Sequence, residues 1–313
     1  MQVNLYQCGL QQFEEWNEFV AKSKNGTFLF DRRFMDYHAD RFHDYSMMFY
    51  DEDRLLAVMP AHVDGDSLIT HGGLTYGGLV MSPKIRAAQV CEIFRHLNDL
   101  LRRSGFRRVV YKAVPWIYHQ QPAEEDLFAL MSVCHAHLAI RDISSVIVGD
   151  RKMRFSDSRK DGIRKARRKG LEVHESTDFA AFWQILNDNL TSKYGVRPVH
   201  SAAELELLHS RFPDQIKLWM VFDGEQPLGG TVLFLTPQVL HTQYISATPV
   251  GKACGAIDLL FDHLINSVFA DYRYIDFGKS TSSDSADLNV QLIFQKEGFG
   301  ARAVCYDTYE WTI

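Results

Sequence analysis

The sequence predicts an α/β protein of two consecutive units, each a mixed β-sheet flanked by helices. Short β-like runs alternate with amphipathic helices along all 313 residues. In each half, a predicted hairpin leads into a long helix, beginning near Ile85 and near Ala256, and an apolar strand follows each helix within a few residues. This shared order suggests duplication of one unit. The polar stretch 150–170 separates the two series, which places the units at 1–150 and 151–313.

In the first unit, helices are predicted from apolar residues at helical spacing, and strands from β-branched or aromatic runs bounded by turn residues. Gly105 is the expected C-terminal stop of its longest helix. The predicted strands are 2–7, 46–51, 55–63, 67–73, 108–114 and 139–148, and the predicted helices are 10–23, 85–103 and 123–133.

The second unit repeats this pattern, and its first long helix is entered through the capping side chains of Ser176, Thr177 and Asp178. A turn at 224–227 joins two strands, and the next strand pairs back as a hairpin. The predicted strands are 171–174, 216–223, 229–235, 239–247, 274–277 and 301–311, and the predicted helices are 179–194, 202–212, 256–270 and 290–297.

The bulk composition is that of a folded, reducing-compartment protein. Hydrophobic residues make up 46% and aromatic residues 12%, which is enough for a core and excludes global disorder. The net charge of −5 gives no general attraction to nucleic acid or anionic membrane. Five scattered cysteines without a CxxC pair, and no HExxH run, argue against a disulfide framework or a metal site. The chain shows neither a signal-like start nor a membrane-spanning apolar run, so we expect a cytoplasmic protein.

One segment departs from this average, because residues 151–170 hold ten Lys or Arg against two acids. A helix so rich in cations can grip polyphosphate, whether a nucleotide diphosphate or an RNA backbone. The alternative is a solvated helix between the units whose charges face water.

A glycine-containing turn at 246–256 is the second candidate site. It joins a strand to a helix, where backbone N–H groups and the helix dipole favour an anion. Gly251, Lys252 and Gly255 are the candidate ligands. An ordinary strand–helix turn explains the same glycines equally well.

The third candidate lies near the end of the chain, where the strand segment 274–281 (YIDFGKST) is followed by 294–300 (FQKEGFG). Lys279 or Lys296 could polarise a carbonyl under attack and hold the developing oxyanion. Asp276 could act as a base toward an attacking amine, or could simply cap the next turn. Lys296 could equally be an ordinary surface lysine at a helix end.

These segments resemble the FemAB-like branch of the GNAT acyltransferases. The family signature is a Tyr-Asp-Phe-Gly strand followed by a Phe-Lys-x-Gly-Phe-Gly element, although here Phe294 is displaced by Gln295. The run 163–170 (IRKARRKG) is similar to the Ile-Arg-Lys-Ala-x-x-x-Gly segment between the two lobes of such proteins. The resemblance implies two tandem GNAT-like lobes and a carbonyl-stabilising lysine at Lys296.

The resemblance also implies where the substrates bind. In GNAT enzymes the turn at 248–253 holds the coenzyme A pyrophosphate, but Thr248 stands where Arg or Gln is usual. Family members acting on cell-wall precursors bind a nucleotide-linked peptide. Its diphosphate would meet Arg164, Lys165 and Arg168, and Tyr76 beside a Gly-Gly run would lie near the acceptor groove. The full set of candidate site residues is Lys296, Asp276, Gly251, Lys252, Gly255, Arg164, Lys165, Arg168, Tyr76 and Lys279.

The expected function is therefore transfer of an acyl or aminoacyl group onto an amine, with no tightly bound cofactor. The donor would be acyl-CoA, as in an N-acetyltransferase, or aminoacyl-tRNA. The acceptor would be an amine, such as that of a nucleotide-linked or lipid-linked cell-envelope precursor. The alternative is a non-catalytic RNA- or nucleotide-binding module that uses the basic segment 151–169.

Overall fold

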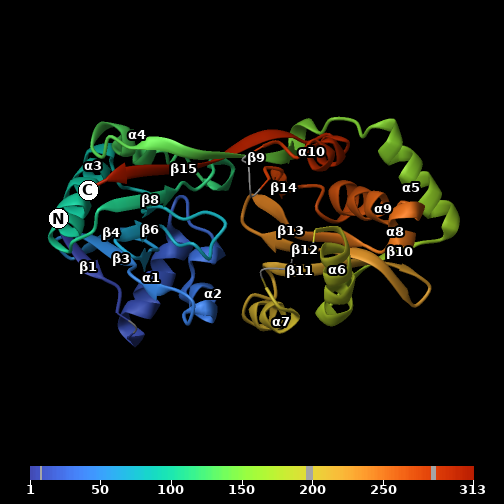
Figure 1. Cartoon of the computed structure of the whole chain (residues 1–313), viewed down its shortest axis with the longest axis horizontal. Coiled ribbons are helices and arrows are strands. Elements are labelled where there is room, and N and C mark those ends of the chain that lie inside the picture. The colour runs from blue at the N-terminus through green and yellow to red at the C-terminus, as the bar shows by residue number, and fades with distance from the viewer. Residues whose placement is uncertain (8, 195–199, 283–286) are drawn as a thin grey trace. The chain divides into compact units, whose positions relative to one another are not determined.

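The structure is a computed structural model of the chain and describes residues 1–7, 9–194, 200–282 and 287–313. The chain forms two compact units (Figure 1). Unit 1 comprises Met1–Asp142 together with Cys305–Ile313, and unit 2 comprises Ile143–Val304. The units are thus not consecutive, unlike the division expected at 150. The reason is that the last strand pairs inside unit 1, where Trp311 is buried in the core.

Unit 1 contains two groups of strands. The first is a four-stranded antiparallel sheet of order β1-β3-β4-β7. In the second, β8 pairs antiparallel with β15 and parallel with β6, and β5 and β2 follow. The bounds are β1 Gln2–Leu5, β2 His43–Asp44, β3 Met47–Asp51, β4 Arg54–Met59, β5 His62–Asp64, β6 Ser67–Ile69, β7 Val80–Met81, β8 Arg108–Lys112, β9 His137–Val148 and β15 Arg302–Thr312.

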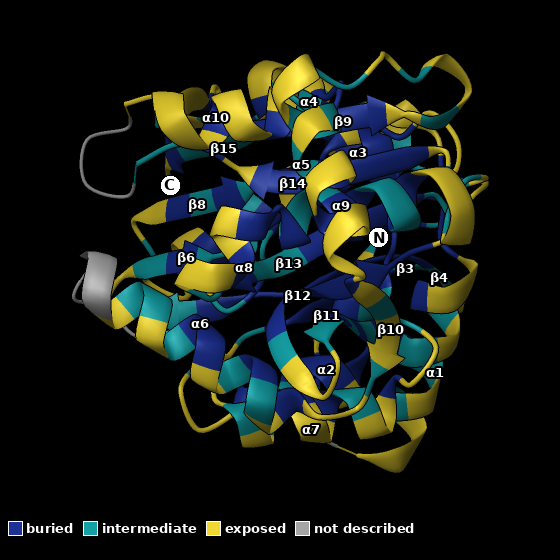
Figure 2. Cartoon of the chain, turned by 90° about the vertical axis from the view of Figure 1, so that its right-hand side faces the viewer, coloured by how far each residue is buried: buried dark blue, intermediate teal, exposed yellow. Residues whose placement is uncertain are grey.

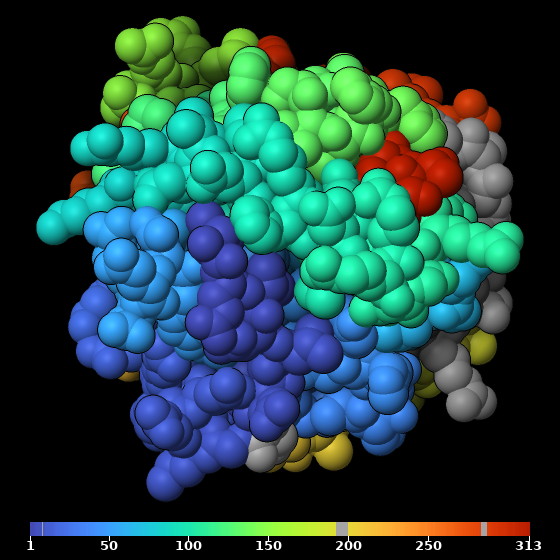
Figure 3. Space-filling view, turned by 90° about the vertical axis from the view of Figure 1, so that its left-hand side faces the viewer, coloured from blue at the N-terminus to red at the C-terminus, as the bar shows by residue number. Residues whose placement is uncertain are grey.

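The helices of unit 1 are α1 (Leu10–Lys22), α2 (Arg32–Met35), α3 (Ala87–Arg103) and α4 (Glu125–Ser132). The long α3 buries an apolar stripe at helical spacing, including Val90, Phe94 and Leu97, in the core of the unit. The C-terminal residues, red in Figure 3, lie beside the cyan and green residues of this helical region.

The segment 28–38 folds into short helices that the sequence did not predict. Within it, Arg32 is buried and ion-paired with Asp36 at 2.5 Å and Asp44 at 2.8 Å, and its guanidinium lies 4.0 Å from the centre of the Tyr6 ring. These contacts hold short helical turns that would not be stable alone.

Three buried histidines pack together in unit 1. The His71 ring centre lies 5.3 Å from that of His38 and 5.7 Å from that of His62. Burial lowers the pKa of all three, and it is the largest cause of the fall of the His71 pKa to about 2, to which repulsion from neighbouring cationic groups adds. The cluster is therefore uncharged at neutral pH.

Unit 2 is built on one mixed sheet of order β10-β11-β12-β13-β14-β9, to which β9 contributes its second half. Only the β13–β14 pair is parallel. The strand bounds are β10 Glu172–Ser176, β11 Ile216–Asp223, β12 Gln226–Leu235, β13 Val239–Ala247 and β14 Tyr274–Lys279. Figure 2 shows β12 and β14 in the dark blue of buried residues.

Helices cover both faces of this sheet: α6 and α7 lie on one face, and α5, α8 and α9 on the other (Figure 1). The expected helix 256–270 is shorter, since it ends in a π-helical turn (Leu264–Val268), and the separate α8 precedes it. The helix bounds are α5 Asp157–Lys169, α6 Phe179–Tyr194, α7 Ala202–Arg211, α8 Pro249–Cys254, α9 Ala256–His263 and α10 Val290–Glu297. Among the described residues, no helix is long and apolar enough to cross a membrane.

Candidate functional site

The parallel strands β13 and β14 separate part-way along the sheet of unit 2. They pair only from Val239–Tyr274 to His241–Asp276, although β13 runs on to Ala247 and β14 to Lys279. A bulge at Gln243 in the pairing of β13 with β12 lies just past the separation. The sheet is therefore open on one side of β13, where its backbone can meet a ligand.

Unsatisfied polar side chains mark the same opening. The Thr242 Oγ1 and Gln243 Oε1 atoms are buried and have no hydrogen-bond partner among the described residues. Buried polar atoms are rarely left without a partner in folded proteins. Their position immediately after the separation of the strands indicates that a bound molecule or water completes this site.

Asp276 and His241 form a buried pair at the point of separation. His241 Nδ1 lies 2.8 Å from Asp276 Oδ2, while Asp276 Oδ1 accepts hydrogen bonds from Gly278 N at 3.0 Å and from Ser144 Oγ. The Asp276 side chain has no exposed surface, whereas His241 keeps 11% of its side chain exposed. A carboxylate can only accept hydrogen bonds, so Nδ1 carries the proton and Nε2 is the basic nitrogen.

The sequence left two roles open for Asp276, a base toward the amine or a cap of the next turn. Its burial and its three hydrogen bonds instead suit it to orient His241. His241 was not among the site residues predicted from the sequence. The sequence does carry a sign of this pair, because His241 and Asp276 are each the third residue of a strand whose first two residues are apolar. The sign can be used only once it is known that these two strands pair in parallel.

Lys296 projects from α10 onto the end of β14. Its ammonium donates to the carbonyls of Gly278 and Lys279, both at 2.8 Å, and to Ser280 Oγ at 3.0 Å. Burial lowers its pKa to about 8, and the nearby Asp276 partly opposes this shift. The three N–H groups fix the end of the strand, so Lys296 can meet an oxyanion only by exchanging one of these bonds. Lys279 accepts one of these hydrogen bonds through its backbone carbonyl and is itself an exposed residue.

The turn that begins α8 offers few N–H groups for a pyrophosphate. Thr248 N donates to Leu228 O, Gly251 N to Thr248 Oγ1 and Lys252 N to Thr248 O, and Pro249 has no N–H. Four of the five backbone nitrogens from 248 to 252 therefore have no hydrogen available for a phosphate. This turn departs from the anion cradle that the sequence suggested.

Close packing accounts for the two candidate glycines of this turn. A Cβ on Gly251 would lie 2.2 Å from Leu228 O, and one on Gly255 would lie 2.3 Å from the Gly162 O of α5. Gly255 also has φ of +81°, a left-handed conformation that ends α8 and separates it from α9. Lys252 is hydrogen-bonded to the Asn189 side chain.

The basic helix α5 lies directly against α8 and α9. Lys165 donates to Ala253 O at 2.5 Å, so the proposed cofactor and substrate segments are neighbours. Arg164 pairs with Asp161 on its own helix, and Arg168 is exposed. Other cations of the segment meet carboxylates from elsewhere in unit 2, which offsets much of its charge: Arg159 meets Asp258, Arg167 meets Asp262 and Lys169 meets Asp223.

Tyr76 belongs to unit 1, where its ring is 2% exposed. Its hydroxyl donates to Thr27 Oγ1 at 3.1 Å, and its ring packs against Tyr118 with centres 4.5 Å apart. The described part of the chain holds no group of three His, Cys, Asp or Glu side chains suited to a metal ion.

Comparison with known proteins places this geometry in a family context. Residues 157–284 match the acetyltransferase (GNAT) domain family. No curated protein matches the sequence. Among solved structures, FemX is similar over 100% of this chain and 98% of its own, with a TM-score of 0.68 and 9% identity.

Two further structures share the fold. The C-terminal domain of a proposed lysylphosphatidylglycerol synthetase from Agrobacterium fabrum has a TM-score of 0.60 and 11% identity, over 95% of this chain and 91% of its own. A tandem GNAT protein of the clavulanic acid biosynthesis pathway has a TM-score of 0.53 and 10% identity, over 99% and 98%. These matches confirm the two tandem GNAT-like lobes and the resemblance to FemAB-like proteins.

Proposed function

We propose that this chain, which contains a GNAT domain match and shares the fold of FemX, is an aminoacyltransferase of the FemAB-like kind, that its donor is an aminoacyl-tRNA and that its acceptor is a primary amine. The observation that carries this choice of donor is the turn 248–252. Of its backbone nitrogens, Pro249 carries no hydrogen and all the others except Val250 donate within the protein, so a coenzyme A pyrophosphate would lack most of the donors that such a turn normally provides.

The basic helix α5 supports the same donor. Of its three candidate cations, Lys165 turns to the carbonyl of Ala253, whereas Arg164 and Arg168, four residues apart on one face of the helix, are exposed. Cations spread along a helix suit successive phosphates of a nucleic-acid backbone better than a single diphosphate.

In the proposed reaction, the acceptor amine attacks the carbonyl carbon of the aminoacyl ester in the opening between β13 and β14. A C–N bond forms, and His241 Nε2 takes the proton that the amine loses. The ester C–O bond then breaks, and the protonated His241 returns its proton to the leaving ribose oxygen. Lys296 stabilises the oxyanion by exchanging its 3.0 Å bond to Ser280 for a bond to the substrate.

For the acceptor we propose an amine on a nucleotide-linked or lipid-linked envelope precursor, made in the cytoplasm. The name of the lysylphosphatidylglycerol synthetase neighbour, which pairs an aminoacyl group with a lipid, supports this choice. Tyr76 is buried in unit 1, so its part in acceptor binding would be to shape a groove rather than to contact the substrate.

Donor binding tests the proposal directly. Purified protein is titrated with coenzyme A and acetyl-CoA in a calorimeter, and in parallel with charged and uncharged tRNA on a filter. Retention of charged tRNA, with loss of its labelled amino acid to an added amine, is the expected result. Saturable binding of acetyl-CoA without tRNA retention would overturn the proposal of an aminoacyl-tRNA donor. The protein would then be an N-acetyltransferase, the alternative that Gly251 and Lys252 in the turn before α9 favour.

A further inference from the structure

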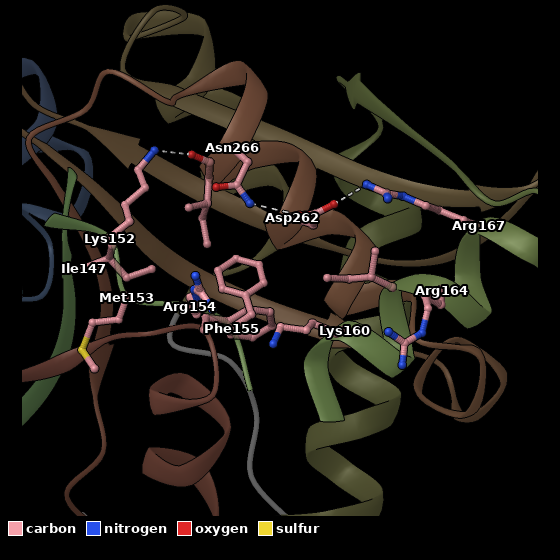
Figure 4. A pocket seen from close by; sticks show the side chains of 13 residues that line it. Ile147, Lys152, Met153, Arg154, Phe155, Lys160, Arg164, Arg167, Asp262 and Asn266 are labelled. Atoms are coloured by element: carbon pink, nitrogen blue, oxygen red, sulfur yellow. Dashed lines mark hydrogen bonds and ion pairs between the residues drawn. The ribbon is translucent and has the colours of Figure 1, made fainter. Parts of the chain in front are cut away.

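A cavity of about 470 Å³ lies in unit 2 between α5, the segment that precedes it and the end of α9 (Figure 4). Five of its lining side chains are cationic: Lys152, Arg154, Lys160, Arg164 and Arg167. The lining contains one carboxylate, Asp262. Such an excess of positive charge around a hollow favours an anionic ligand.

Two of these cations are committed to the protein, and three are available. Lys152 donates to the carbonyls of Ile265 at 2.8 Å and Ala270 at 2.9 Å. Arg167 pairs with Asp262 at 2.6 Å, and Asn266 donates to the other oxygen of that carboxylate, as Figure 4 shows. These contacts build the wall of the cavity rather than a place for an anion.

The available cations are Arg154, Lys160 and Arg164. Lys160 and Arg164 pair with acids three residues away on their own helix, and those acids are 94% and 65% exposed. Exposed pairs of this kind contribute little, so an incoming anion can displace them. Arg154 is exposed and forms no ion pair within the part of the chain that the structure describes. Arginine guanidinium groups bind phosphate oxygens in pairs, which makes phosphate the fitting anion.

The remaining lining is apolar. Ile147, Ile163 and Phe299 belong to the hydrophobic core of unit 2, and Phe155 packs edge-on against Phe299 with ring centres 5.4 Å apart. Met153, at the rim, is 47% exposed. Ile147, Ile163 and Phe299 are already buried, so the apolar surface open to solvent is that of Met153 and the half-buried Phe155. A bare phosphate would leave this surface in water, whereas a phosphate carrying an apolar or aromatic group would cover it.

The cavity is separate from the opening between β13 and β14. Ile147 of β9 is opposite Ile275 of β14, and Val146 is opposite Asp276. Successive residues of a strand point to opposite faces of the sheet. Ile147 therefore faces the cavity on one side, and the Asp276–His241 pair lies on the other.

We infer that this cavity binds a phosphate or diphosphate ester with an apolar or aromatic organic group, at a site distinct from that of acyl transfer. The phosphate oxygens meet Arg154, Lys160 and Arg164, and the organic group lies against Phe155 and its neighbours. The two sources of this chemistry are a nucleotide and a prenyl or lipid phosphate.

The test compares three diphosphates that differ only in their organic part. Calorimetric titration is carried out with uridine 5′-diphosphate, geranyl diphosphate and inorganic pyrophosphate. One of the organic diphosphates should bind with one-to-one stoichiometry at least about tenfold more tightly than pyrophosphate, because only it gains the apolar contacts. Whichever binds identifies the source.

Two arginines of α5 supply a matched pair of variants. Arg164→Gln removes a lining cation and should weaken the binding about tenfold. Arg168→Gln makes the same change of charge on the same exposed helix but outside the cavity, and should change the affinity less than threefold. Asp276→Asn, on the opposite face, should leave it unchanged.

Three results would each overturn the inference: no binding of either organic diphosphate, equal binding of pyrophosphate, or equal losses in Arg164→Gln and Arg168→Gln. None of them bears on the proposed donor, which is tested with tRNA and coenzyme A.

Discussion

Replacing Asp276 by asparagine isolates the role of the buried carboxylate, because the two side chains have nearly the same shape. In the wild type, Asp276 Oδ2 accepts from His241 Nδ1 at 2.8 Å and Oδ1 accepts from Gly278 N at 3.0 Å. The asparagine oxygen can keep the bond to Gly278, which turns its NH₂ group toward His241. Nδ1 must then accept a hydrogen bond, and the ring proton moves to Nε2.

This change of tautomer removes the base while leaving the fold intact. A positioned general base contributes about 10²–10⁴-fold to a rate, or about 2.7–5.4 kcal/mol of the barrier. We therefore expect the transfer rate of Asp276→Asn to fall by that factor, with charged tRNA still retained on the filter. The assay is single-turnover transfer of a labelled amino acid from charged tRNA to an amine, as a function of pH.

Two variants control this experiment. Ser144→Ala removes one hydrogen bond to Asp276 but leaves the tautomer of His241 unchanged, so its rate should fall less than about tenfold. His241→Gln should match Asp276→Asn, and the double variant should be no slower than either single one, because both remove the same base. If Asp276→Asn is folded, keeps its melting temperature and still transfers within threefold of the wild-type rate, then His241 oriented by Asp276 is not the base.

Three further predictions concern stability, each measured by urea or thermal unfolding. Gly255→Ala should destabilise unit 2 by at least about 2 kcal/mol, because a Cβ would lie 2.3 Å from Gly162 O at a φ of +81°; Gly170→Ala, at a positive φ in open space, is the control and should cost less. Arg32→Met should cost about 3–5 kcal/mol, since it leaves two partly buried carboxylates without their partner; a loss below 1 kcal/mol would contradict this. The stability of unit 1 should fall as the pH falls below about 6.5. Below that pH the unfolded chain protonates His71, whereas the folded protein does not, because burial lowers the pKa of His71 to about 2. The free energy of unfolding should fall by about 1.4 kcal/mol per pH unit, and this slope should be shallower in His71→Asn.

The regular elements of unit 2 could be predicted closely from the sequence. The bounds of Phe179–Tyr194, Ile216–Asp223, Val239–Ala247 and Val290–Glu297 are those expected, because each segment has a clear hydrophobic period and turn or capping residues at its ends. The short α8 was missed because its six residues, which begin with Pro249, are too few to show a helical period.

The placement of elements relative to one another was less accessible. The C-terminal strand returns to unit 1 to pair with β8, although nearly 200 residues separate the two. Local patterns carry no information on such a pairing. The segment 28–38 was also missed, because its helices depend on the buried ion pairs of Arg32.

The candidate site shows the same division. Asp276 and Lys296 stood out because they lie in a recognisable motif, and the structure places Asp276 in the separation of the strands and Lys296 at the end of β14. His241 stands in no motif and acquires its partner only through the parallel pairing of β13 with β14. Arg164, Lys165 and Arg168 were expected to act together on one diphosphate. Arg164 and Arg168, four residues apart, share a helix face, whereas Lys165 turns to the carbonyl of Ala253, a contact that no local pattern predicts.

Gly278 explains why the motif at the end of β14 has the form Asp-Phe-Gly-Lys. Its φ of +73° belongs to a bulge between Asp276 and Lys279, a conformation that glycine adopts without strain. In that conformation its N–H returns to Asp276 while its carbonyl accepts from Lys296, and the absence of a side chain leaves room for the His241 ring, which a Cβ would meet at 3.3 Å. The three groups assigned to proton transfer and oxyanion binding are thus held by one residue that has no chemistry of its own. The strand end is therefore a single unit, in which the orientation of His241 depends on the same bulge that Lys296 fixes.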